Sequence, residues 1–156
     1  MHPLTRTTAL LISLAACGGR KPAPVQDTAT TVAAGGALTA FEQENGIGPI
    51  KEAMVVGPLD EKMAEAGEQV FELKCSACHK MDEKYVGPAL RGATGRRTPA
   101  YLMNMILNPQ EMVDRHPVAK QLLAEHMSFM PNQGLTQDEA RQVLEYLREK
   151  ADEKKD

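Results

Sequence analysis

The clearest helical pattern in the first half of the chain runs from Asp60 to about Lys74. Hydrophobic and small residues recur at i, i+4, i+7 and i+8 from Met63, and Asp60 is a residue type that caps helix N-termini. Gly67 lies in the middle of this face. Since glycine inside a helix costs about 1 kcal/mol relative to alanine, its presence predicts the close approach of a second helix.

The last strong pattern begins at Thr136, which forms a capping box with Glu139. Apolar residues then follow at i, i+3, i+4 and i+7, namely Ala140, Val143, Leu144 and Leu147. We expect this final helix to be the partner that crosses the helix containing Gly67.

Between these helices the pattern is poor in strands. Thr98-Pro99 starts a helix that Pro109 ends, and a short helical insertion runs from Pro117 to about Glu125. The pattern therefore predicts an all-α domain over residues 60–150, followed by a charged tail at 151–156.

The residues before this domain have no helical or strand period. Residues 17–40 are mostly Ala, Thr, Gly and Pro, which predicts a flexible tether. Residues 41–59 hold two apolar patches broken by Gly-Pro, so we expect an extended collar packed on the outside of the domain, with an unstructured extension as the alternative.

The N-terminus has the pattern of an export signal. Residues 1–16 carry Arg6 and an apolar run that is too short to span a bilayer, which indicates a signal peptide. Leu14-Ala15-Ala16-Cys17 resembles the lipobox of bacterial lipoproteins, which implies cleavage before Cys17 and its acylation; an ordinary cleavage site with an incidental Cys is the alternative. We expect a periplasm-facing protein of a bacterial envelope, anchored by lipid to a membrane, with Gly18 favouring the outer one.

Composition narrows the choice of function. The 156-residue chain has a formal net charge of −3, which argues against nucleic acid as a partner. Aromatic residues make up 4% and Trp is absent, so the polypeptide core is thin for its length. A bound prosthetic group would supply the missing apolar bulk.

The run Cys75-Ser76-Ala77-Cys78-His79 is the attachment signature of a c-type haem. Two thiols at this spacing can each add to a haem vinyl group, and the adjacent imidazole then ligates the iron. The alternatives are a zinc half-site, a disulfide or a redox dithiol. A structural zinc site needs four ligands, and no second ligand pair follows downstream. A disulfide would leave His79 without a role. A redox dithiol of the thioredoxin type occurs in a βαβ unit, which this strand-poor pattern does not contain. We therefore predict one covalent haem c.

With these motifs the chain resembles a class I (mitochondrial-type) monohaem cytochrome c. The resemblance covers about residues 60–150 and rests on the haem motif, on Gly87-Pro88-Ala89-Leu90, on Met130-Pro131 and on the two terminal helices. It implies the class I fold, with terminal helices that cross and loops that enclose the haem. It also implies that the Pro88 carbonyl accepts a hydrogen bond from His79 and that Leu90 packs on the ring.

The sixth ligand of the iron is a choice among several residues. Met130 lies in a loop before the capped last helix, as the family's axial Met does, and is favoured; Met127 is its rival, and His126 or no sixth ligand stay open. Met103 and Met105 fall on a helix, where Met usually fills the core. A thioether opposite an imidazole raises the reduction potential relative to two imidazoles.

Other candidates concern the haem edge and the remaining histidines. One of the two loop arginines, Arg96 and Arg97, can pair with a haem propionate, or both stay solvated, and Tyr85 can reach a propionate or only pack. His116 and His126 are expected to be exposed or at helix ends.

These features predict an electron carrier and not an enzyme, because His and Met ligation leaves no open position on the iron. Its partners would be redox proteins, a respiratory donor and a terminal reductase or oxidase, with no small-molecule substrate. The collar and distal segment are weakly similar to lipid-anchored cytochromes encoded beside nitrous-oxide reductase, and anchored monohaem subunits of respiratory complexes are an equal precedent. The alternatives are a fixed subunit of a respiratory complex, or a haem sensor or enzyme with an open sixth site.

Overall fold

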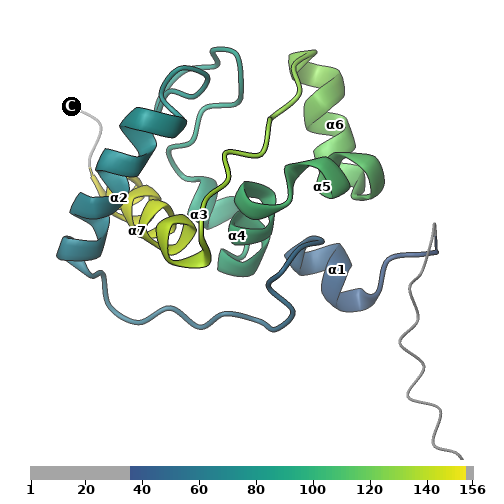
Figure 1. Cartoon of the computed structure of the whole chain (residues 1–156), viewed down its shortest axis with the longest axis horizontal. Coiled ribbons are helices and arrows are strands. Elements are labelled where there is room, and N and C mark those ends of the chain that lie inside the picture. Colours follow the sequence, from purple (N-terminus) through teal and green to yellow (C-terminus); the bar gives the residue numbers. More distant parts are fainter. Residues whose placement is uncertain (1–35, 154–156) are drawn as a thin grey trace, which may run out of the picture. The chain divides into compact units, whose positions relative to one another are not determined.

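A computed structural model describes residues 36–153, which contain helices and no β-strand. The helices are α1 (Ala40–Asn45), α2 (Glu61–Lys74), α3 (Ala93–Arg96), α4 (Pro99–Leu107), α5 (Pro109–Arg115), α6 (Pro117–His126) and α7 (Gln137–Asp152) (Figure 1). The prediction of an all-α fold is therefore confirmed for this part of the chain. None of these helices is long and apolar enough to cross a membrane.

Helices α2 and α7 pack across each other, as the two terminal patterns predict (Figure 1). Asp60 accepts the N–H of Met63 at 3.0 Å and so caps α2, while Thr136 and Glu139 form the capping box of α7. Gly67 is buried against α7, where an added Cβ would collide with the carbonyl oxygen of Gln142. The absence of a side chain at Gly67 therefore lets the two backbones touch.

The collar differs from the expected extended segment. Thr39 and Glu42 form a capping box that starts α1, so a helix occupies the first residues of the collar, and only the part after Gly46 lacks regular structure. Local capping explains the difference, because it satisfies the free N–H groups at the start of the helix.

The collar is tied to α4 by one buried side chain. The amide of Asn104 donates to the carbonyls of Asn45 and Ile50 at 2.9 and 3.0 Å, and its Oδ1 accepts the N–H of Ile50 at 2.9 Å. Gly46 and Gly48 lie against Met112 and Asn104 so closely that a Cβ at either position would collide. The collar is therefore part of the folded domain and not a loose extension.

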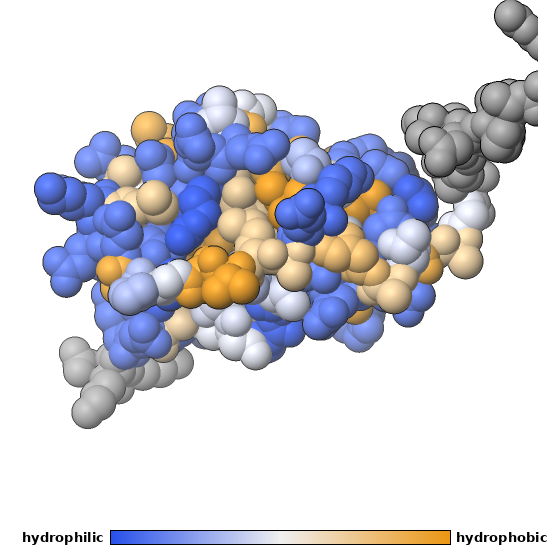
Figure 2. Space-filling view, turned by 90° about the horizontal axis from the view of Figure 1, so that it is seen from below, coloured by the Kyte–Doolittle hydropathy of each residue, from blue (hydrophilic) through white to orange (hydrophobic). Residues whose placement is uncertain are grey.

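Further along the collar, apolar side chains alternate between core and solvent. Met54 and Val56 pack against the cluster of Met103 and Leu144, whereas Val55 is 98% exposed. Seen from below, the molecule shows hydrophobic residues as a band between hydrophilic ones (Figure 2). The collar thus covers part of the core and leaves some apolar surface open.

Helix α6 is the insertion expected from Pro117, whereas α5, which Pro109 starts, was not expected from the sequence. His116, between them, accepts the N–H of Val118 on Nδ1 at 3.3 Å, and its Nε2 lies 3.1 Å from the carbonyl of Gln43. His116 is 1% exposed, so the expected helix end is found but exposure is not. This histidine links the insertion to α1.

Several predicted segments lie outside the described residues. They are the signal peptide at 1–16, Cys17, most of the tether at 17–40 and the last three residues of the tail. Helix α7 itself continues to Asp152, two residues past the predicted domain end.

Candidate cofactor site

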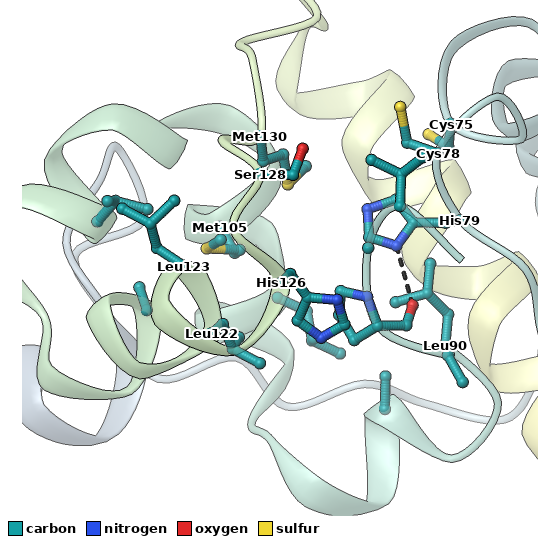
Figure 3. A pocket seen from close by; sticks show the side chains of 18 of the residues that line it. Cys75, Cys78, His79, Leu90, Met105, Leu122, Leu123, His126, Ser128 and Met130 are labelled. Atoms are coloured by element: carbon teal, nitrogen blue, oxygen red, sulfur yellow. Dashed lines mark hydrogen bonds between the residues drawn. The ribbon is translucent and has the colours of Figure 1, made fainter. Parts of the chain in front are cut away.

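A cavity of about 280 Å³ lies between the proximal loop, residues 75–90, and the distal segment, residues 117–135. Cys75, Cys78 and His79 line one side of it, and Met105, Leu123 and Met130 lie opposite (Figure 3). Three cationic residues, Lys74, Arg96 and Arg97, line the cavity, and no carboxylate does. The cavity is thus mostly apolar, with two thiols and an imidazole on one wall.

The imidazole of His79 is held by the backbone of the following loop. Its Nδ1 lies 3.0 Å from the carbonyl oxygen of Pro88 (Figure 3), and Nδ1 donates to it in the neutral ring, leaving Nε2 free to bind a metal. Gly87 lies against the other side of the ring, where an added Cβ would be 2.8 Å from Nδ1. Burial lowers the pKa of His79, although the bond to Pro88 opposes this effect. His79 is therefore oriented as a neutral ligand.

The two thiols are placed by the end of α2. Cys75 is the C-cap of this helix, and the backbone N–H groups of Cys78 and His79 both donate to its carbonyl, at 3.0 and 2.9 Å. This tight turn brings Cys75 and Cys78 to the same cavity. Burial raises the pKa of the Cys75 thiol to about 11, and Cys78 adds to the shift. Both cysteines are free of disulfides.

Across the cavity, the methionines differ clearly in position. Met130 lines the cavity, whereas Met127 is 87% exposed and does not. Met103 is buried in the core, as expected for a helical Met, and Met112 is buried as well. Met105 packs against the core cluster around Tyr101 and Met112, as expected, but it also lines the cavity. The face of α4 that carries Tyr101, Leu102 and Met105 is turned to the cavity because Met103 and Asn104 are buried on its other sides.

The loop that carries Met130 is tied to the surrounding helices. Asn132 donates to the carbonyl of Leu107 at the end of α4, at 3.1 Å, and accepts the N–H of Gly134 at 2.8 Å. On the other side, Lys84 of the proximal loop donates to the carbonyl of Glu125 at 2.9 Å. The bond of Lys84 thus joins the two sides of the cavity, and the bonds of Asn132 fix the segment that carries Met130 to the end of α4.

Two buried polar atoms at the cavity have no protein partner, the hydroxyl of Tyr101 and Nδ1 of His126. A buried polar group without a hydrogen bond costs roughly 1–3 kcal/mol. Sequence patterns did not single out Tyr101, because a tyrosine inside an apolar helix gives no sign of the direction its hydroxyl takes.

The remaining candidates at the haem edge divide into two groups. Arg96 and Arg97 line the cavity, and Arg96 already donates to the carbonyls of Ala89 and Arg91 at 3.2 and 3.1 Å. Leu90 also lines the cavity. Tyr85 does not; it is 55% exposed, with Lys80 Nζ 5.5 Å from its ring centroid.

Comparison with known proteins agrees with this geometry. The family model described as "Cytochrome c" matches residues 64–150. The chain therefore belongs to the cytochrome c family, and its class is that of class I monohaem cytochromes c, which bind haem c covalently and transfer electrons.

Individual relatives are bacterial. Cytochrome c2 of Rhodopseudomonas palustris is 42% identical over 45 residues, a match that spans 29% of this chain and about a third (32%) of that relative. A cytochrome c from Rhodothermus marinus is similar in structure, with a TM-score of 0.67 and 45% identity over 70% of this chain and 95% of that one. An engineered form of that cytochrome, bound to a carbene intermediate, has a TM-score of 0.65 and 45% identity, over 72% of this chain and 97% of that one.

The residues present fit a haem. The cavity is walled by apolar side chains, it holds two thiols beside an oriented imidazole, and its cationic side chains suit the carboxylates of such a group. The thioether of Met130 lies across the cavity from His79 (Figure 3). A nitrogen and a soft sulfur donor are ligands that haem iron accepts in cytochromes.

Proposed function

We propose that this chain is a lipid-anchored cytochrome that carries single electrons between respiratory proteins. In this proposal Cys75 and Cys78 hold the haem, and His79 and Met130 ligate its iron. The observation that carries the proposal is the placement of His79 and Met130 on opposite sides of one apolar cavity. A bound haem c supplies the one-electron couple of its iron.

The chain's own residues then set the properties of that couple. The carbonyl of Pro88 orients His79 and raises its basicity, which favours ferric iron, while a thioether from Met130 favours ferrous iron. The apolar wall formed by Leu90, Val113 and Leu123 excludes water and so also favours the less charged ferrous state. The expected result is a carrier with a high reduction potential.

The ligand assignment is tested with Met130→His and its matched control Met127→His. Ferric iron with a thioether ligand has a weak far-red absorption band, which imidazole ligation removes. We expect Met130→His to lose this band and to have a lower reduction potential, because a second imidazole favours ferric iron. Met127→His keeps the band, since residue 127 faces solvent. Loss of the band in Met127→His alone would contradict the assignment.

Carbon monoxide binding to the unsubstituted protein distinguishes an electron carrier from a haem sensor or enzyme with an open sixth site. We expect the reduced native protein not to bind carbon monoxide, because His79 and Met130 occupy both axial positions. Rapid binding of carbon monoxide by the unsubstituted protein would favour the open-site alternative.

The anchor and the partners belong to this proposal too. Cleavage before Cys17 and its acylation would hold the protein at the periplasmic side of a membrane, where a respiratory donor and a terminal reductase or oxidase could meet it. In cells that mature the full chain, we expect Cys17→Ser to move the haem-containing protein from the membrane fraction to the soluble fraction. If the native protein is itself soluble, the anchor is ruled out. Co-purification with respiratory subunits in a constant ratio would instead identify a fixed subunit of a complex.

A further inference from the structure

The described part of the chain presents two thioethers to the cavity, although one axial position needs only one. Met105 on α4 and Met130 in the distal segment lie on the side of the cavity opposite His79 (Figure 3). Leu122 and Leu123 cover the same region with hydrocarbon alone. Met105 also packs against the core cluster around Tyr101 and Met112, but a leucine of similar volume would fill that contact equally well, so packing does not account for a sulfur at this position.

The two methionines are held in very different ways. Met105 is on a regular helix that the neighbouring, buried Asn104 ties to the collar, so its backbone has little freedom. Met130 follows Met127, which has a φ of 51° and is the one non-glycine residue with positive φ in residues 36–153. Met127 is the C-cap of α6, and residues 128–136 after it have no regular secondary structure. The backbone of Met130 therefore lacks the helical hydrogen bonds that hold the backbone of Met105, and its segment is held instead by the side-chain bonds of Asn132 and Lys84.

We infer that Met105 is a reserve ligand, a second thioether that would bind the haem iron when the distal segment moves Met130 away from it. This inference rests on the proposed function, in which Met130 is the ordinary ligand. A methionine side chain has three rotatable bonds and a soft sulfur, so it can turn from a packed position to a coordinating one without movement of the helix. With His79 and Met105 as its ligands, a bound haem would still have one nitrogen and one sulfur donor, as it would with His79 and Met130.

His126 is the competing donor for the same role. It lines the cavity but lies at the end of α6, close to Leu122 in Figure 3 and away from the sulfurs of Met105 and Met130, and its Nδ1 is buried by protein. A carboxylate of the haem is the partner that its position suits better. Ligation by His126 would remove the far-red thioether band, so the two donors can be told apart.

The experiment uses the haem-loaded protein with Met130→Leu, Met105→Leu and the double variant, together with Met130→Leu/Met103→Leu. Met103 is the matched control, because it lies on the same helix but is buried against Ala140 and Leu144. Exchange of Met for Leu nearly conserves volume and is well tolerated in a core. The measurements are the far-red thioether band of the ferric protein and carbon monoxide binding to the ferrous one.

We expect Met130→Leu and the control variant Met130→Leu/Met103→Leu to keep a thioether band and to bind carbon monoxide poorly. The Met130→Leu/Met105→Leu variant should lose the band and bind carbon monoxide fully. Loss of the band in Met130→Leu, with either carbon monoxide binding or a spectrum of two imidazoles, overturns the inference. Loss of the band in Met105→Leu alone would instead show that Met130 is not the ordinary ligand, and so would contradict the proposed function. If Met130→Leu fails to mature, Met130→Ala tests the same outcomes with more space around the iron.

Discussion

At the scale of single residues, the site depends on backbone atoms as much as on side chains. The proposed ligand His79 is fixed by the carbonyl of Pro88, and this carbonyl can approach because the preceding residue, Gly87, has no side chain. The motif that holds the cofactor is therefore only part of the site. The Gly-Pro step that follows sets the orientation of the ligand.

Gly87→Ala tests this role. Its Cβ would lie 2.8 Å from Nδ1 of His79, so the ring or the loop has to shift and the bond to Pro88 weakens. We expect a loss of roughly 1–3 kcal/mol in the free energy of unfolding, measured by chemical denaturation of the haem-loaded protein. The reduction potential should rise, because a less basic imidazole favours ferric iron less.

Gly57→Ala is the control for this substitution, since nothing lies within 4 Å of a Cβ at Gly57. We expect it to leave the potential unchanged and the stability within about 0.5 kcal/mol. A Gly87→Ala protein with native potential and stability would show that the loop adapts without disturbing His79.

At the scale of elements, the contacts of Phe71 and Gly67 determine how α2 and α7 pack against each other. Phe71 of α2 packs against Tyr146 of α7 with ring centroids 5.3 Å apart, and Gly67 sits against the backbone of α7 one turn earlier. Because α2 ends at Cys75, the angle between α2 and α7 also sets the position of the thiols. Helix packing and cofactor attachment are therefore coupled.

Gly67→Ala separates helix propensity from packing. Alanine should favour α2 by about 1 kcal/mol through propensity, but its Cβ would collide with the carbonyl of Gln142. We expect a net loss of about 1–3 kcal/mol, measured by denaturation. Gly95→Ala in α3 is the helical control, because a Cβ there meets nothing within 4 Å. It should be neutral or slightly stabilising, and a stabilising effect at Gly67 would show that the helices can move apart freely.

At the scale of the whole molecule, a buried carboxylate joins three separate segments. Glu145 of α7 has a fully buried side chain, and it accepts hydrogen bonds from Arg141 at 2.6 Å and from the backbone N–H of Asp60 at 3.1 Å. Arg148 pairs with the same carboxylate and also donates to the carbonyl of Gly57 at 2.7 Å. Collar, α2 and α7 thus meet at one charge cluster.

This cluster predicts the response to acid. Burial by itself raises the pKa of Glu145, but the bonds from Arg141, Arg148 and Asp60 outweigh it, and the net pKa lies below the ordinary value of 4.5. A carboxyl with a lower pKa in the folded state stabilises that state above pH 4.5, and this contribution is lost as the pH falls through the folded pKa.

Glu145→Gln should therefore cost about 2 kcal/mol near pH 7, because it removes a charge that two arginines face. The difference from the native protein should shrink as the pH falls below 4.5, measured by denaturation at several pH values. Glu65→Gln on the exposed face of α2 is the control and should change stability by less than about 0.5 kcal/mol at any pH. A Glu145→Gln difference that does not change with pH would place the effect in packing instead of charge.

The sequence alone determined the features that depend on neighbouring residues. Caps at Asp60 and Thr136, the periodic faces of α2 and α7 and the haem motif are local patterns, and each is recognisable because helix geometry relates residues three and four apart. The small residue at Gly67 indicated a close helix contact for the same reason. Resemblance to a family then supplied Pro88 and Met130, which no local rule singles out.

Tertiary structure alone decided which residues meet when they are far apart in the chain. Nothing in the local sequence indicates that Asn104 binds the collar, that His116 is buried against Gln43, or that Met105 faces the cavity while Met103 does not. Such contacts depend on the relative placement of several helices, and an apolar helix such as α4 is buried on more than one side, so its periodicity does not tell core from cavity. The packing of α4 between collar, insertion and α7 is what turns one of its methionines toward the cofactor site.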